Sequence, residues 1–230
     1  MMYRPRRKTG LERVLVDIAT QRDFLVTNGP MAVHNRADVH PKIRALMGWA
    51  RGQSIPVVSC IQAYRPGDDA NGRPRHCIDG TPGQQKMPYT LLPKWVMVDA
   101  DNTYAVPIDL MRRARQVIFR KRTDDLLANP KADRLLNDLR PDRFILFGVG
   151  LETWIRLLAL GMMVRQNRVT VVSDACGYWD PVAADLTLRQ LEAKGVQLVT
   201  TDELVVTEPA APRPRTRPVV KKLHEVKSKD

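Results

Sequence analysis

The 230-residue chain has only three cysteines, Cys60, Cys77 and Cys176, and no two of them have the C-x-x-C spacing of a zinc or redox site. This scarcity excludes a fold built on disulfides and is typical of a protein of the reducing cytoplasm, where we expect this one. No apolar run approaches the ~18 residues that span a bilayer, and no secretory signal follows the basic start. No membrane insertion is therefore expected.

Acidic residues are scarce relative to basic ones, at 25 against 37, which gives a formal net charge of +12. The excess lies at the two ends: residues 1–8 hold four basic residues and no acid, and residues 209–230 hold seven basic residues and two acids. We expect a basic N-terminal segment (1–11), one domain (12–207) and a Pro-rich, disordered basic tail (208–230). The tail could contact acidic surfaces or nucleic acid weakly, or be a solvated extension without a specific partner.

Short apolar runs alternate along the chain with segments of helical spacing. The runs predict six strands, at residues 13–19, 54–61, 116–121, 143–149, 168–173 and 196–200. Helices are predicted over 38–53, 131–139 and 181–195, and around Trp154. This alternation indicates an α/β fold of three layers, a mostly parallel six-stranded sheet with helices on both faces. The Gly/Pro-rich segment 64–95 interrupts it and is a candidate functional loop.

Three residues fall where the carboxyl ends of parallel strands meet, the usual ligand crevice of such a sheet. Asp17 lies at the end of the first predicted strand, Lys121 at the end of the third, and Trp154 at the start of the helix after the fourth. An acid and an amine in an apolar crevice would shift each other's pKa and could transfer a proton. They could equally form a buried ion pair that only fixes geometry.

Four sequence stretches occur in a specific order: "VLVDIATQRDFL", "RHCIDGTPGQQ", "VIFRKRTDDLL" and "VTVVSDACGYWD". Together they resemble the isochorismatase-like cysteine hydrolases, which include nicotinamidases, carbamoylsarcosine amidases and isochorismatases, over roughly residues 12–205. The resemblance implies that Asp17 is the catalytic acid/base, with two extra residues between it and Asp23-Phe24, and that Lys121 is the catalytic lysine. It also implies a small-molecule ligand and assembly into homo-oligomers.

The family's nucleophile motif, Gly-Val-x-Thr-x-x-Cys-Val, is where the sequence departs from its relatives. Aligning Gly148-Val149 places Leu151 at the Thr and Trp154 at the Cys. An indole is neither nucleophile nor base, so we expect covalent thiol chemistry to be absent. Thr153 points about 100° away from that position on a helix, and Cys60 is expected to be a buried structural thiol.

Two hypotheses follow from this departure. In the first, the protein is a non-catalytic member in which Trp154 fills the vacated pocket and Asp17 and Lys121 remain as a structural pair. In the second, it is an active hydrolase without a thiol, which cleaves a vinyl ether or a small amide. Asp17 would then be the general acid/base, and Trp154, Phe24 and Leu151 would contact the substrate.

No metal or other cofactor is expected in either case. The Asp-x-His pattern with which nicotinamidases bind metal after their second strand reads Gln62-Ala63-Tyr64-Arg65 here.

Overall fold

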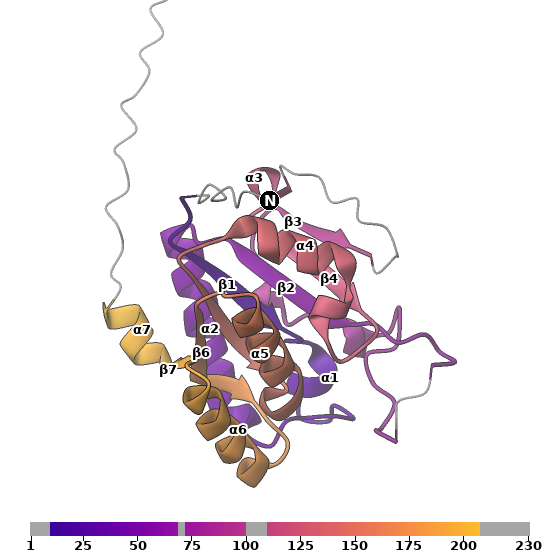
Figure 1. Cartoon of the computed structure of the whole chain (residues 1–230). Coiled ribbons are helices and arrows are strands. Elements are labelled where there is room, and N and C mark those ends of the chain that lie inside the picture. The colour runs from indigo at the N-terminus through magenta and orange to yellow at the C-terminus, as the bar shows by residue number, and fades with distance from the viewer. Residues whose placement is uncertain (1–9, 69–71, 100–109, 208–230) are drawn as a thin grey trace, which may run out of the picture.

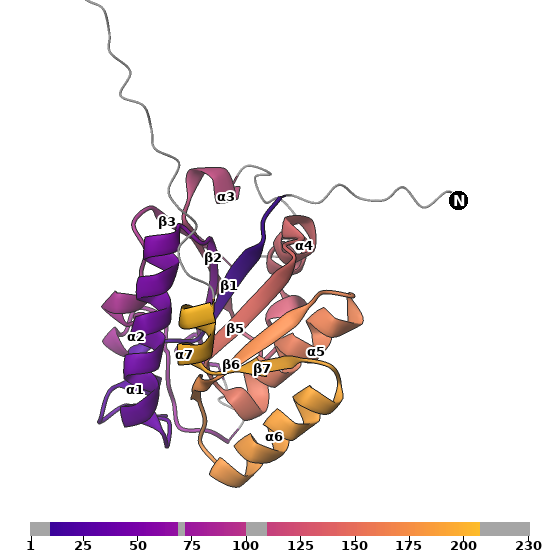
Figure 2. The ribbon, with the colours of Figure 1, turned by 90° about the vertical axis from the view of Figure 1, so that its left-hand side faces the viewer.

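The computed structural model describes residues 10–68, 72–99 and 110–207. The expected tail, 208–230, and nearly all of the expected segment 1–11 lie outside the described residues. The described part forms one sheet with helices on both faces (Figures 1 and 2). No helix within these ranges is long and apolar enough to cross a membrane.

The sheet has seven strands within the described residues, in the order β3-β4-β2-β1-β5-β6-β7, and every neighbouring pair is parallel. The strands are β1 (Arg13–Ile18), β2 (Val57–Gln62), β3 (Trp95–Val98), β4 (Gln116–Lys121), β5 (Arg143–Val149), β6 (Val169–Gly177) and β7 (Gln197–Val199). All six predicted strands are confirmed. The prediction of six strands in total was wrong because β3 is a four-residue, partly exposed edge strand directly after the Pro-rich segment.

The helices are α1 (Arg22–Leu25), α2 (Arg36–Gln53), α3 (Leu110–Arg113), α4 (Pro130–Leu139), α5 (Arg156–Val164), α6 (Pro181–Ala193) and α7 (Thr201–Thr207). Helices α4, α5 and α6 cover one face of the sheet, and α2 and α7 cover the other (Figure 2). The four predicted helices correspond to α2, α4, α5 and α6. Helix α7 was not predicted, because its seven residues are too few to show a helical period.

Local sequence signals explain where the helices start. Asn129 precedes α4, and its side chain accepts hydrogen bonds from two backbone N–H groups of the first turn. Asp180 does the same for α6, with distances of 2.8 and 3.2 Å. Each helix then begins with a proline, whose missing N–H costs nothing at that position.

The described part of segment 64–95 is folded onto α1 rather than extended into solvent. The Asp23 carboxylate accepts a hydrogen bond from the backbone N–H of Cys77 at 2.6 Å. A Cβ added at Gly83 would collide with the same carboxylate, so glycine is required there. Gln21 donates to the backbone oxygens of Gln62 and Gln84 at 2.9 and 2.8 Å. These contacts join the candidate loop to the strand ends.

Candidate active site

The chain turns from β5 into α5 through two glycines at which any side chain would be strained and crowded. Gly148 has φ +127°, and a Cβ there would collide with the backbone oxygen of Ile18. Gly150 has φ +82°, and its Cβ would lie 2.7 Å from the Trp154 ring. The chain then makes one π-helical turn (Leu151–Ile155) that continues into α5. Trp154 therefore lies in the first turn after the strand, as the sequence predicted.

The Trp154 indole is enclosed by other side chains and is only 2% exposed. Phe24 and Trp179 pack edge-on against it, with ring centroids 5.2 and 5.3 Å away. Its Nε1–H donates to Asp124 Oδ1 at 2.7 Å. Because the ring has both apolar neighbours and a partner for its one polar atom, it is a fully satisfied core residue.

Lys121 lies against the same indole, with Nζ 4.4 Å from the ring centroid, in a cation–π contact. The side chain is buried, and among the described residues Nζ donates to the backbone oxygens of Thr123 and Asp124, both at 3.3 Å. Burial lowers the pKa of Lys121 to about 8, although the Cys60 thiol and the Asp124 carboxylate nearby favour its charged form. Trp154 therefore covers the Lys121 ammonium.

Asp17 has a different partner. Its Oδ2 forms a salt bridge of 2.6 Å with Lys86 Nζ and accepts a hydrogen bond from Ser59 Oγ at 3.0 Å. Its Oδ1 accepts from Thr20 Oγ1 at 2.8 Å, and Lys86 donates to the same hydroxyl at 2.7 Å. The Asp17 side chain is 0% exposed and that of Lys86 is 2% exposed. Asp17 and Lys86 are thus a buried, hydrogen-bonded ion pair.

The expected meeting of Asp17 with Lys121 is contradicted, because the two side chains lie on opposite faces of the sheet. Asp17 and Ser59 are in register and hydrogen-bonded, and Gln116 donates to Ser59 Oγ at 2.8 Å, so these three share one face. Lys121 follows Gln116 by five positions in β4, and side chains alternate along a strand. Lys121 therefore points to the other face, where it meets Trp154.

The two extra residues between Asp17 and Asp23 allow a second alignment. If Asp23-Phe24 is the fixed point, the acid's place falls on Ala19, which has φ +50° and donates its backbone N–H to the backbone oxygen of Cys60. Ala19 has no carboxylate, and the carboxylate of Asp17 lies on the face of the sheet opposite to Lys121. Neither alignment gives Lys121 an acidic partner from β1.

The sequence also gave no indication of Asp124 and Arg73, which complete the surroundings of Trp154. Arg73 binds both oxygens of Asp124, at 3.0 and 3.1 Å, and Asp124 in turn holds the indole N–H. Hydrogen bonds from Arg73 and Trp154 lower the pKa of Asp124 against the opposing effect of burial. Asp124 is three residues after Lys121, but Arg73 lies in the segment without periodicity, so the pair could not be inferred.

The family model described as "Isochorismatase domain" matches residues 13–203. The chain belongs to the isochorismatase family. A search among curated proteins finds no significant match. Among solved structures, the family member is similar to a pyrazinamidase of Pyrococcus horikoshii determined in complex with zinc (20% identity, TM-score 0.67, 82% of this chain and 99% of that one). It is also similar to an isochorismatase-like hydrolase from Alkaliphilus metalliredigens (21%, 0.69, 85% and 98%) and to N-carbamoylsarcosine amidase from Thermoplasma acidophilum (20%, 0.64, 84% and 98%).

Zinc does not fit the corresponding side chains of this family member. The last residue of β2 and the residues after it offer the amide of Gln62, the phenol of Tyr64 and the guanidinium of Arg65, none of which is a good zinc ligand. The residues that the structure describes also contain no group of three or more His, Cys, Asp or Glu placed to hold an ion.

The other predicted site residues of this isochorismatase-family chain lie in the core. Phe24 is 0% exposed and Leu151 is 1% exposed, and Phe24 contacts the Trp154 ring. The three cysteines are buried as free thiols, and burial raises the pKa of each. A thiol with a raised pKa is a poor nucleophile, so none of the three is suited to thiol chemistry.

Replacing Gly150 by alanine should lower the free energy of unfolding by about 1–3 kcal/mol more than the same change at Gly80. Both have nearly the same φ, +82° and +81°, but only at Gly150 would the new Cβ press on Trp154. Urea denaturation of Gly150→Ala and Gly80→Ala therefore separates crowding from backbone strain. Equal losses in the two variants would mean that the indole is not packed against the glycine turn.

Proposed function

We propose that this isochorismatase-family protein is non-catalytic by the family's thiol route and acts through binding instead. The observation that carries the proposal is the environment of Trp154: the residue at the nucleophile position is stacked on Lys121 and hydrogen-bonded to Asp124. A covalent thiol mechanism needs a thiolate, a cation to stabilise it and an acid/base within reach of both. Here the thiol is replaced, the lysine is covered, and the Asp17 carboxylate is bound to Lys86.

In this proposal Phe24 and Leu151 support the indole rather than a substrate. Both are buried, and Phe24 packs edge-on against the ring. The alternative, vinyl ether or small-amide hydrolysis with Asp17 as general acid/base and Lys121 positioning it, requires both groups to act on one substrate. Their positions on opposite faces of the sheet argue against it.

In this proposal the protein binds a small-molecule ligand or a partner protein in the cytoplasm. The partner protein can be a second copy of the chain. Self-association is supported by Val182 and Leu186, which lie one turn apart on α6 and are 77% and 67% exposed. Sedimentation velocity of the full chain and of Leu186→Glu tests this part. The variant should sediment as the smaller species.

We expect the purified full-length protein to give no turnover of nicotinamide, N-carbamoylsarcosine or isochorismate above a buffer blank. The test compares the wild type with Lys121→Met, which removes the ammonium that lies against Trp154. A nicotinamidase assayed in parallel shows that the assay detects turnover. Hydrolysis by the wild type that is lost in Lys121→Met would contradict the proposal.

A further inference from the structure

Three neighbouring strands, β1, β5 and β6, have an arginine at or just before their first residue, and these arginines are in register with one another. Arg13 and Arg143 are register partners at the starts of β1 and β5. Arg168 immediately precedes β6, and since Val169 pairs with Phe144, Arg168 falls opposite Arg143. Adjacent strands lie about 4.8 Å apart, so the three residues form a row across the N-terminal edge of the sheet. We call Arg13, Arg143 and Arg168 the arginine row.

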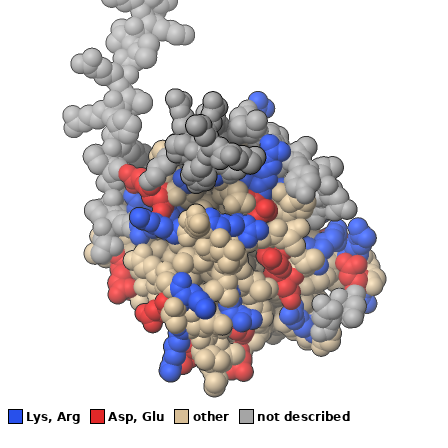
Figure 3. All heavy atoms as spheres, in the orientation of Figure 1, with Lys and Arg blue, Asp and Glu red and all other residues tan. Residues whose placement is uncertain are grey.

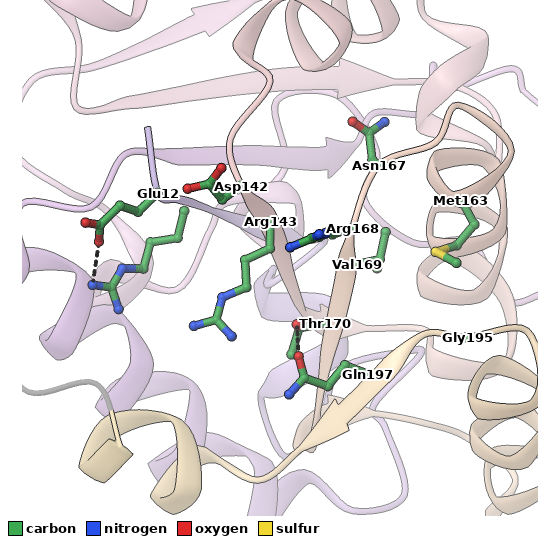
Figure 4. Close-up of a pocket in the computed structure, with 11 residues that line it drawn as sticks. Glu12, Asp142, Arg143, Met163, Asn167, Arg168, Val169, Thr170, Gly195 and Gln197 are labelled. Carbon is green, nitrogen blue, oxygen red and sulfur yellow. Dashed lines mark hydrogen bonds and ion pairs between the residues drawn. The ribbon is translucent and has the colours of Figure 1, made fainter. Parts of the chain in front are cut away.

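The arginine row borders a cavity of about 840 Å³ (Figure 4). Thr170 and Gln197, hydrogen-bonded to each other at 3.2 Å, form a polar part of its lining. Met163 and Val169 form an apolar part, and Glu12 and Asp142 also line it. This volume is in the range of pockets that bind small organic ligands. The cavity lies at the strand starts, whereas Trp154 and Lys121 lie at the strand ends.

Like charges directly opposite each other on neighbouring strands are destabilising unless something compensates them. Arg13 is partly compensated by Glu12 at 3.1 Å, but that carboxylate is 76% exposed. Burial and the nearby charge of Arg13 lower the pKa of Arg143. In the part of the chain that the structure describes, the guanidinium of Arg168 has no hydrogen-bond or ion-pair partner. The guanidinium of Arg168 is therefore available to bind an anion at the edge of the cavity.

We propose that this cavity binds the phosphate groups of a ligand, with Arg143 and Arg168 as the principal contacts. A guanidinium offers a planar fork of donors that matches two phosphate oxygens, and the side chains of Arg143 and Arg168 extend from adjacent strands, so both can contact the phosphates of one ligand. Thr170 and Gln197 supply neutral hydrogen-bonding groups beside them. The phosphates come either from a nucleotide-sized molecule, which the volume suits, or from a nucleic-acid backbone, which the basic residues preceding Arg13 in the sequence would favour.

Surface charge alone does not explain the arrangement. On the face shown in Figure 3, basic and acidic side chains are interspersed, as on an ordinary solvated surface. The arginine row differs because backbone register fixes its members side by side at a cavity. An exposed arginine such as Arg189 on α6, which is 75% exposed and paired with Asp185 at 2.7 Å, is the matched control.

Calorimetric titration of the full-length protein with pyrophosphate, ATP and a ten-nucleotide single-stranded RNA tests the proposal. Wild type should bind at least one of these probes. Arg168→Glu and Arg143→Gln should each weaken that binding about tenfold or more, because each removes charge-assisted hydrogen bonds to phosphate. Arg189→Glu should change the dissociation constant less than twofold. Arg168 lies outside the strands and is exposed, so its variant is expected to fold, which circular dichroism confirms.

The outcomes separate the two sources of phosphate. Binding of pyrophosphate or ATP that both variants weaken identifies a nucleotide-sized ligand, and RNA binding that both variants weaken identifies a nucleic-acid backbone. Absence of binding by all three probes overturns the proposal. The proposal is also overturned if Arg168→Glu and Arg143→Gln change the dissociation constant no more than Arg189→Glu does. The contacts with phosphate would then lie elsewhere on this basic chain.

Discussion

Replacing Asp17 by alanine will lower the free energy of unfolding by about 3–5 kcal/mol, the usual cost of removing one partner of a buried ion pair. The change leaves the Lys86 ammonium buried, with Thr20 as its remaining hydrogen-bonding partner. It also removes the acceptor of Ser59 Oγ, which is 0% exposed. Urea denaturation at pH 7 measures the loss.

Two further variants make this prediction specific to the pair. Arg189→Ala breaks an exposed ion pair on α6 and should cost less than about 1 kcal/mol. The double variant Asp17→Leu/Lys86→Met replaces both charges by apolar groups and should recover most of the stability that Asp17→Ala loses. If the loss of unfolding free energy in the double variant equals the sum of the losses in Asp17→Leu and Lys86→Met, the two side chains are not coupled. The buried ion pair would then not explain the loss in Asp17→Ala.

This result bears on how activity is tested in the protein. Asp17→Ala is the obvious control for an isochorismatase-family hydrolase, but a loss of 3–5 kcal/mol can unfold a marginally stable domain. Lost turnover in that variant would therefore not identify Asp17 as catalytic. Lys121→Met is the better control because, among the described residues, the Lys121 ammonium forms no salt bridge, donates to two backbone oxygens and lies against a ring.

Most of the fold could be predicted because its signals are local. Buried parallel strands such as β4 and β5 are continuous apolar runs, and the helices between them carry apolar residues at helical spacing. Strand β3 could not be found this way, since its four residues are half-exposed and pair with β4 alone. Helix α7 depends on a tertiary contact: the Asp174 carboxylate accepts hydrogen bonds from the backbone and side chain of Thr201, both at 2.8 Å.

The candidate site was predicted less well because its pairing depends on register. Sequence correctly placed Asp17 and Lys121 near strand ends, but the face on which each side chain lies is set by which residues pair across β1, β2 and β4. A shift of one residue reverses that face. The true partner, Lys86, follows two glycine-containing turns in a segment without periodicity, so no pattern linked it to Asp17.

The position of Trp154, in contrast, was predictable, because a strand, a glycine turn and a helix follow one another in the sequence. What the structure adds is that the indole has its own partners, Asp124 for its N–H and Phe24 for its ring. These partners make the immediate surroundings of the indole complementary to it. Two buried side chains nearby, Gln62, the register partner of Lys121, and His76, which packs against Phe24, nevertheless have polar atoms without a hydrogen-bond partner among the described residues.

The stability of the wild type relative to Lys121→Met should rise between pH 8 and pH 10.5, by about 3 kcal/mol at most. Burial lowers the pKa of Lys121 from 10.5 to about 8, so the folded protein releases this proton at a lower pH than the unfolded chain does. Between those values the unfolded chain binds more protons, and the free energy of unfolding therefore increases with pH. Below pH 8 both states carry the charge, and the full cost of burying it opposes folding.

The comparison with Lys121→Met is needed because other buried groups make the stability fall as pH rises. Burial raises the pKa of the Cys60 thiol and of Tyr64, so the folded protein holds those protons to a higher pH than the unfolded chain, and stability falls as they titrate. These contributions largely cancel in the difference between the two proteins. In Lys121→Met the pKa of Cys60 is raised further, because the nearby ammonium no longer favours the thiolate. This also makes the stability of the wild type rise with pH relative to that of the variant. Urea denaturation of both proteins at pH 7.5 and pH 10 measures it, and parallel profiles would show that Lys121 is not a buried cation held under Trp154.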